Sequence, residues 1–260
     1  MSRPTIGLAL GSGGAKGFAH IGIIKVLAEA GIPIDYIAGS SMGALVAACY
    51  GVGHEWDRME QMALSFKRTH YLDFTIPKMG FITGKKITDL IRVITYQKKF
   101  EDCRIPVKLV ATDLLSGERV VFDQGYLFKA VRASLSIPGI FVPVRWGGRI
   151  FVDGGVVDRV PTQIVRDMGA DLVISVDVSS FSGDAVIQSI FDVIVQSIDI
   201  MQQQLVNLQE THADVVIKPP VSHFNSRAFT NLEQIIKLGE EAARSKLSDI
   251  QSLIKSWKEE

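Results

Sequence analysis

The sequence predicts an α/β protein with a mainly parallel central sheet, and two observations carry that prediction. The first is the alternation of short apolar segments with amphipathic segments of helical period near the start of the chain. The second is a pair of glycine-rich turns, at 11–17 and 39–43, each joining an apolar segment to the helical segment that follows. Strand–helix–strand units of this kind place their strands in parallel.

The remaining elements follow from the same patterns. Strands are expected where short β-prone runs are bounded by turn residues, at 5–10, 34–38, 107–113, 118–122, 171–178 and 215–218. Helices are expected where apolar residues recur at helical spacing, at 18–30, 42–51, 54–67, 85–97, 126–135, 160–168, 186–209 and about 231–258. Residues 140–145 and 149–152 are expected to form a hairpin across Gly147 and Gly148. No repeat or linker interrupts the chain, so we expect one domain over 1–260, with its motif-bearing core at about 5–219.

Two segments allow alternative interpretations. Residues 69–84 are aromatic and weakly periodic, and they suit a lid over a site or a long connection between helices equally well. The long helix at 186–209 has an apolar stripe, which we expect to pack in the core rather than to face a membrane. The stripe consists of Ile187, Ile190, Phe191, Ile194, Ile198, Met201, Leu205 and Leu208.

Composition excludes several classes of protein. Apolar residues make up 47% of the 260 residues, which is enough for a large core. Lysine plus arginine and aspartate plus glutamate both number 28, so no charge excess suggests a nucleic acid partner. The two cysteines, Cys49 and Cys103, fit neither a disulfide framework nor a zinc site. No signal or membrane-spanning segment is evident, so we expect a cytoplasmic protein that could touch a membrane without crossing it. Nothing indicates the oligomeric state.

The turn Gly39-Ser40-Ser41-Met42-Gly43 has the pattern G-x-S-x-G between an apolar strand and a helix. A sharp turn of this kind holds its central serine in a strained conformation, with the hydroxyl exposed near the positive end of the helix. A glycine turn that happens to contain a serine would give the same letters. The strand–turn–helix context favours Ser41 as a nucleophile.

The earlier turn, Gly11 to Gly17, follows the first strand and opens a helix. Its amides, above all those of Gly13 and Gly14, can point into one concavity and stabilise an oxyanion. A phosphate loop is the competing interpretation. The dinucleotide pattern would need glycine where Lys16 stands, and no Walker Gly-Lys-Ser/Thr string is present. A purely structural turn is a further alternative.

The base that would activate Ser41 is the discriminating question. His212 and His223 are late enough for a Ser-Asp-His order, but neither lies in a motif, and both fit surface positions better. Asp153 ends a predicted strand and precedes Gly154 and Gly155, which allow close approach. By itself Asp153 is equally consistent with an ordinary Asp-Gly turn.

The three motifs together, in this order on an α/β chain, resemble the patatin-like phospholipase family. The segment from Ala133 to Val144 resembles that family too, and the likeness extends from Ile6 to about Pro219. It is strongest with compact bacterial members of the neuropathy-target-esterase branch. Two positions depart from the family pattern: Ser12 stands where a glycine is usual, and Lys16 where arginine is frequent.

The resemblance implies a three-layer α/β/α patatin-like fold and a Ser-Asp dyad without histidine. Ser41 would be the nucleophile and Asp153 the base, with Gly13 and Gly14 forming the oxyanion hole. The supporting positions would be Ser12, Ala15, Lys16, Gly17, Gly39, Gly43, Gly154 and Gly155. Lys16 is expected to order the loop or to favour an anionic head group.

The expected function is a serine esterase that hydrolyses acyl esters of lipids, of the phospholipase A or lysophospholipase type, through an acyl-enzyme. It would need neither metal nor cofactor, and its partner would be a lipid or acyl-ester substrate. The alternative is a regulatory or scaffold protein that keeps the fold and binds acyl lipids without catalysis.

Overall fold

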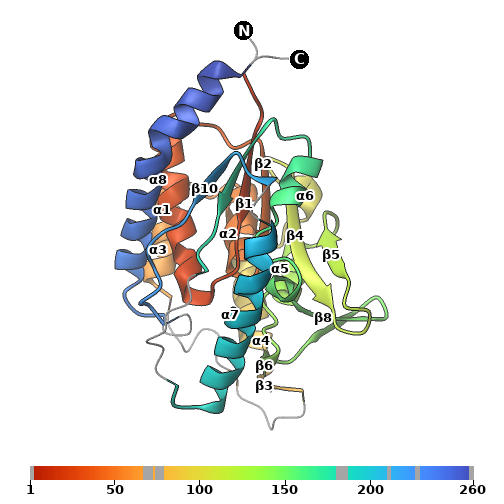
Figure 1. Ribbon diagram of the computed structural model, residues 1–260. Coiled ribbons are helices and arrows are strands. Elements are labelled where there is room, and N and C mark those ends of the chain that lie inside the picture. Colours follow the sequence, from red (N-terminus) through yellow and green to blue (C-terminus); the bar gives the residue numbers. More distant parts are fainter. Residues whose placement is uncertain are drawn as a thin grey trace.

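A central sheet of eight strands organises the molecule (Figure 1). In the computed structural model, residues 3–66, 73, 79–179, 187–209, 212–225 and 229–257 are described. The strands of the sheet are β1 (Ile6–Leu10), β2 (Tyr36–Ser40), β4 (Val107–Asp113), β5 (Arg119–Phe122), β7 (Val144–Trp146), β8 (Arg149–Asp153), β9 (Leu172–Val176) and β10 (Val215–Ile217). Their order is β10-β9-β1-β2-β4-β8-β7, and β5 pairs with β4 outside that path.

The strands from β10 to β4 are parallel, whereas β5, β7 and β8 run antiparallel to their neighbours. The strand β1 lies at the centre, pairs with β2 on one side and β9 on the other, and is buried at every position. The carboxyl ends of β1 and β2 therefore lie side by side, and the two glycine-rich turns leave the sheet at the same edge.

Helices cover both faces of this sheet. They are α1 (Ala19–Glu29), α2 (Met42–Gly51), α3 (Trp56–Leu64), α4 (Lys85–Ile94), α5 (Leu127–Ser134), α6 (Thr162–Asp167), α7 (Ile190–Gln209) and α8 (Leu232–Ser256). The described residues also form three short 3-10 turns, η1 (Gly14–Phe18), η3 (Phe100–Asp102) and η4 (Gly154–Val156). In Figure 1, α8 lies alongside α1, and α7 stands in front of the sheet.

Alternation along the central strands divides the core. Leu8, Leu10 and Ile37 belong to the large apolar cluster with α1, α2 and α8, whereas Ala9 and Ala38 face the smaller cluster with α6. Successive side chains of a strand point to opposite faces, so large residues on one face accompany small ones on the other. The expected three-layer α/β/α arrangement with a mainly parallel sheet is confirmed.

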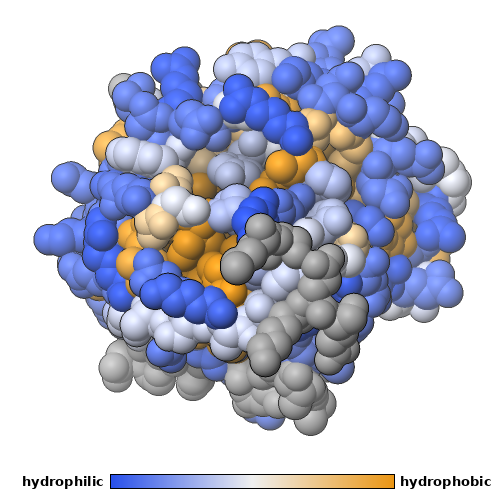
Figure 2. Space-filling model, turned by 90° about the horizontal axis from the view of Figure 1, so that it is seen from above, coloured by the Kyte–Doolittle hydropathy of each residue, from blue (hydrophilic) through white to orange (hydrophobic). Residues whose placement is uncertain are grey.

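The surface in Figure 2 is mostly hydrophilic, with separate patches of hydrophobic residues between the polar side chains.

The expected hairpin is only partly correct. Residues 144–146 and 149–153 do pair across Gly147 and Gly148, but the strand expected at 140–145 is divided in two. Its first part is β6 (Gly139–Phe141), which pairs in parallel with β3 (Gly80–Ile82) in a separate two-stranded sheet. The segment interpreted as a lid or connection lies largely outside the described residues. Within it, Asp73 accepts hydrogen bonds from the amides of Gly84 and Lys85 and so caps the start of α4.

The expectation that the long helix packs its apolar stripe in the core is only partly correct. Ile190, Val193 and Met201 of α7 are 61%, 52% and 60% exposed, whereas Asp192 and Gln202 are buried. The inward side of α7 therefore includes these polar residues as well as Ile194, which packs against Gly139, and Ile198, which lines a small cavity, while part of the apolar stripe faces outward. The described part of the helix begins at Ile190, where the hydroxyl of Ser189 accepts from the amide of Asp192 and donates to the Asp192 carboxylate.

Candidate active site

Ser41 occupies a strained turn between β2 and α2. Its φ is 53° and its ψ is −120°, a conformation that residues with a side chain rarely adopt. The chain passes directly from the last residue of a parallel strand into the first turn of a helix, so the Ser41 side chain stands at the amino end of α2. The partial positive charge of that helix end favours negative charge on the serine oxygen.

The glycines on either side of Ser41 are required by close backbone contacts. A Cβ atom on Gly39 would lie 2.3 Å from the carbonyl oxygen of Gly43. One on Gly43 would lie 2.1 Å from the carbonyl oxygen of Leu10. The pattern of glycines around the serine therefore follows from the tightness of the turn and its packing against β1.

Asp153 lies next to Ser41 although 112 positions separate them in the sequence. The Ser41 hydroxyl donates a hydrogen bond of 2.5 Å to Oδ2 of Asp153. The other carboxylate oxygen, Oδ1, accepts a hydrogen bond from the amide of Gly155 at 2.8 Å. Burial raises the pKa of Asp153 from its ordinary 3.8 to about 6, against the opposing effect of these two hydrogen bonds. The carboxylate is therefore a stronger base than an exposed aspartate and is still ionised at neutral pH.

The segment 133–144 accepts hydrogen bonds from the backbone amides of both Ser41 and Asp153. The amide of Ser41 donates to Oγ of Ser134 at 2.8 Å, and the amide of Asp153 donates to the carbonyl of Ser136 at 2.9 Å. The hydroxyl of Thr112 on β4 donates to the carbonyl of Asp153 at 2.9 Å. These contacts fix the backbone on both sides of the Ser41–Asp153 hydrogen bond. Sequence reasoning did not single out Ser134 or Thr112, because no local pattern marks their roles.

The glycine loop borders the same site. Gly13 and Gly14 line a small cavity together with Ser41 and Asp153. Neither glycine amide donates a hydrogen bond within the described part of the chain, so both remain available to a bound oxygen. Gly13 also packs tightly, since a Cβ atom there would lie 2.5 Å from the side chain of Val178.

The other motif positions surround these donors. Ser12 donates from its hydroxyl to Oγ of Ser40 at 3.0 Å and packs against Gly155. Ala15 and Lys16 are buried, and burial lowers the pKa of the Lys16 ammonium group. Among the positions that accept no side chain, Gly17 lies against Met42 and Gly154 against the carbonyl of Val110. A buried Lys16 suits the ordering of the loop better than contact with a head group.

His20, in the first turn of α1, has a role that the sequence patterns did not reveal. Its imidazole is fully buried, and Nε2 donates to the carbonyl of Gly11 at 2.8 Å. Burial lowers the pKa of His20 to about 4, so the ring is neutral at physiological pH. The histidine thereby anchors the start of the glycine loop. A polar residue in an otherwise apolar helix, three residues after Gly17 ends the loop, is the signal that could have identified it.

The helix α7 covers Ser41 and Asp153. Ser12, Gly13, Gly14, Ser41, Ile137, Pro138, Asp153, Val195, Ile198, Asp199 and Gln202 enclose a cavity of about 50 Å³. Ser41 and Asp153 are only 3% and 4% exposed, so the expectation of an exposed serine hydroxyl is wrong. The strained turn at Ser41 is as expected, but the covering of Ser41 by α7 was not predicted.

Arg159 binds α7 in this position. Its guanidinium donates to the side-chain oxygen of Gln202, and also to Asp199 at 3.1 Å, while its carbonyl accepts from the amide of Ser12 at 2.9 Å. One residue therefore connects the glycine loop to two turns of α7. No motif marks Arg159, because its partners lie about 40 positions further along the chain.

Neither late histidine joins the site. His212 and His223 are both exposed, and neither lines the cavity; the ring of His223 contacts that of Phe224 at a tilt of 40° instead. Across the described residues, no group of three or more His, Cys, Asp or Glu side chains could hold a metal ion. What converges here is a serine hydroxyl, a carboxylate of raised pKa and two free amides, a set suited to acyl transfer.

Comparison with known proteins places these features in context. The model of a family described as patatin-like phospholipase matches residues 8–166. An uncharacterised NTE family protein of Mycobacterium tuberculosis is 43% identical over 181 residues, which are 68% of this chain and 50% of that protein. Patatin-like phospholipase domain-containing protein 6 of Homo sapiens is 35% identical over 184 residues, 68% of this chain and 13% of its own. The chain thus spans about half, or much less, of the length of these relatives.

Solved structures agree on the fold. VipD from Legionella pneumophila superposes with a TM-score of 0.68 at 14% identity, over 96% of this chain and 67% of its own. The type III effector ExoU gives a TM-score of 0.53 at 15% identity, over 95% of this chain and 53% of its own.

Proposed function

Because the chain belongs to the patatin-like phospholipase family, we propose that it is a serine esterase that hydrolyses acyl esters of lipids through Ser41 and Asp153. The family expected from the motifs is confirmed, and the curated relatives include NTE family proteins and a lysophospholipase of Debaryomyces hansenii. A single observation carries the proposed mechanism: the 2.5 Å hydrogen bond from the hydroxyl of Ser41 to the carboxylate of Asp153.

In the first half-reaction, Oγ of Ser41 attacks the carbonyl carbon of the ester while its proton passes to Asp153. The negative charge that forms on the carbonyl oxygen is stabilised by the amides of Gly13 and Gly14 and by the amino end of α2. When the bond to the leaving alcohol breaks, Asp153 returns the proton to the alcohol oxygen. The acyl group is left as an ester of Ser41.

In the second half-reaction, Asp153 takes a proton from a water molecule that attacks the acyl-enzyme. The same amides stabilise the second tetrahedral intermediate. Its collapse restores the Ser41 hydroxyl, with the proton from Asp153, and releases a carboxylic acid. The raised pKa of Asp153, about 6, suits both of its roles, since the group must accept and donate a proton near neutral pH.

Labelling with a fluorophosphonate probe tests the nucleophile. The wild-type protein should be labelled once, and peptide mass spectrometry should find the label on Ser41. Ser41→Ala should lose both labelling and hydrolysis of p-nitrophenyl esters while keeping its circular dichroism spectrum, whereas His212→Ala should keep both activities. Absence of labelling in a folded wild-type protein would favour the alternative, a non-catalytic lipid-binding or scaffold protein.

We further propose that the outer face of α7 contacts a lipid surface. That face consists of Ile190, Val193, Ile200 and Met201, all exposed, and the only charged residues of the helix are Asp192 and Asp199. The inner face of the same helix lines the Ser41–Asp153 cavity, so contact at this face would bring the site to its substrate. None of the helices in the described ranges is long and apolar enough to span a membrane. The contact would therefore be peripheral, in keeping with the cytoplasmic location expected from the sequence.

Cosedimentation with phosphatidylcholine vesicles tests this contact. Since the face carries no charge, binding should change little between low and high salt. Ile190→Gln combined with Met201→Gln should reduce vesicle binding and leave hydrolysis of a soluble ester in place. Val93→Gln, at a position of α4 that is 70% exposed, is the matched control and should bind like the wild type. Unchanged vesicle binding in the double variant would contradict the assignment, and a change in oligomeric state would assign the face to a second copy.

A further inference from the structure

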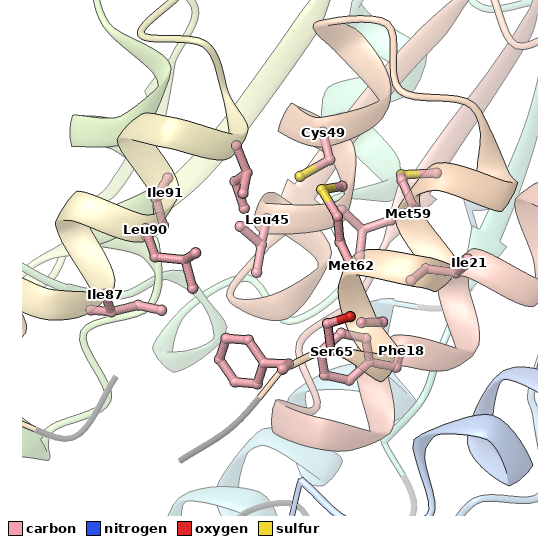
Figure 3. Close-up of a pocket in the computed structure, with 14 residues that line it drawn as sticks. Phe18, Ile21, Leu45, Cys49, Met59, Met62, Ser65, Ile87, Leu90 and Ile91 are labelled. Carbon is pink, nitrogen blue, oxygen red and sulfur yellow. The ribbon is translucent and has the colours of Figure 1, made fainter. Parts of the chain in front are cut away.

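A second cavity, of about 230 Å³, lies on the outer side of the helix that Ser41 opens (Figure 3). Four helices and the end of η1 contribute to its wall. The residues that line it are Phe18, Ile21, Leu45, Val46, Cys49, Met59, Met62, Ala63, Ser65, Phe66, Ile87, Leu90, Ile91 and Ile94. It shares no lining residue with the Ser41–Asp153 cavity and is several times larger.

The described residues of this wall carry no charge. Among them, the only side-chain polar groups are the thiol of Cys49 and the hydroxyl of Ser65. Burial raises the pKa of Cys49 to about 12, so the thiol stays neutral. Protein interiors are otherwise packed as tightly as organic crystals, and a cavity without polar partners does not hold ordered water. The chemistry of the wall therefore selects an apolar guest.

The cavity also has a polar end and an apolar end. Ser65, just after α3, is exposed, whereas Cys49 on α2 and Ile91 on α4 are buried. Figure 3 shows Ser65 beside Phe18 at one end of the cavity and Cys49 at the other. At about 30 Å³ for each methylene-sized group, the volume share of one water molecule, 230 Å³ holds about eight such groups. A guest with a polar end at Ser65 and an apolar tail toward Cys49 matches this arrangement.

We propose that this cavity binds one unbranched hydrocarbon chain of about eight carbons; a fatty acid bound on its own would place its carboxyl end at Ser65. The inference rests on the cavity alone and not on the catalytic roles of Ser41 and Asp153. Two sources share this chemistry: the acyl chain of the ester under hydrolysis, and a fatty acid bound on its own. The cavity borders elements that also form the catalytic site, because Leu45 follows Ser41 by one turn of α2 and Phe18 ends the η1 turn that Gly14 begins.

Calorimetric titration with saturated fatty acids of six to fourteen carbons, below their micelle concentrations, tests the binding. The Ser41→Ala protein is used, so that turnover plays no part. Binding should be saturable at one site, and each added methylene should tighten it about fourfold, the ratio that corresponds to about 0.8 kcal/mol. The gain should stop at about eight buried carbons, because later methylenes remain outside. Absence of saturable binding, or affinity that rises without a plateau, overturns the proposal.

Two variants that change the cavity volume in opposite directions test whether the hydrocarbon chain binds in this cavity. Ala63→Leu adds three carbons to the wall and should move the plateau to shorter acids by about that number. Met62→Ala enlarges the cavity and should move it to longer acids. Ala28→Leu is the matched control, because Ala28 is exposed on α1 and is not among the residues that line the cavity, and it should leave the plateau in place. Circular dichroism establishes that each variant is folded. If neither cavity variant moves the plateau in a folded protein, the chain binds elsewhere and the proposal fails.

The same variants in a protein that retains Ser41 distinguish the sources. If the substrate's acyl chain occupies the cavity, Ala63→Leu should shift the chain-length optimum of p-nitrophenyl ester hydrolysis toward shorter esters. If a separate fatty acid occupies it, the optimum should stay while the binding plateau still moves. A protein without any esterase activity would refute the proposed function and leave the calorimetric result unaffected.

Discussion

Asp153→Asn should make the protein more stable at neutral pH as well as inactive. The folded state raises the pKa of Asp153 from 3.8 to about 6, because burial disfavours the charged carboxylate. A rise of about two units, at 1.36 kcal/mol for each, means that ionised Asp153 costs the folded state about 3 kcal/mol above pH 6. An asparagine carries no charge and can still accept from the amide of Gly155 and donate to Oγ of Ser41. We expect a net gain of about 1–3 kcal/mol at pH 8.

The sign of the pH dependence follows from proton binding. Between pH 3.8 and about 6 the folded wild type holds the Asp153 proton more tightly than the unfolded chain does, so its stability falls as pH rises through that window. The advantage of Asp153→Asn should therefore grow from near zero at pH 4 to its maximum above pH 6. Urea unfolding of both proteins at intervals from pH 4 to 8.5 measures it. The other titrating groups are the same in the wild type and the variant, so their contributions cancel in the difference between the two free energies of unfolding. A difference that does not change with pH, or a less stable variant at pH 8, would refute the raised pKa.

Three further outcomes are expected. The value of kcat/KM on a soluble ester should fall about tenfold for each pH unit below about 6, where Asp153 takes up its proton; a profile flat to pH 5 would exclude Asp153 as the base. Gly14→Ala should lower kcat about 100- to 1,000-fold with little change in KM, by crowding or tilting an oxyanion donor, and unchanged kcat with a lower melting temperature would make the loop a structural turn. His20→Ala should destabilise the fold by about 1–3 kcal/mol, since the Gly11 carbonyl loses its partner, and an unchanged urea midpoint would contradict that anchoring role.

Local patterns were sufficient for the fold and for the turn at Ser41. The strands and helices around β1 and β2 are each encoded within a few residues, and the glycines that the turn needs lie next to the serine. The pairing of Ser41 with Asp153 spans 112 positions, and only the resemblance to a family suggested it, since an Asp-Gly turn alone is ambiguous.

The placement of α7 could not be predicted from its own residues. A stripe of apolar side chains at helical spacing looks the same whether it faces the core or the solvent. Its orientation depends on Arg159, which is buried beside the glycine loop and attracts Asp199 and Gln202 on the polar face. The small cavity and the burial of Ser41 both follow from that long-range contact.

The geometry of the Ser41–Asp153 pair also bears on how such a protein would evolve. Ser41 holds a backbone conformation that glycine would adopt with less strain, a cost of about 1–3 kcal/mol, and Asp153 buries a charge that asparagine would avoid. Ser41→Gly and Asp153→Asn are therefore substitutions that stability alone would favour. A lineage freed from the need for turnover would drift toward them, and an inactive descendant should melt at a higher temperature than its active ancestor. Under the proposed mechanism, selection for catalysis rather than for stability would keep both residues in place.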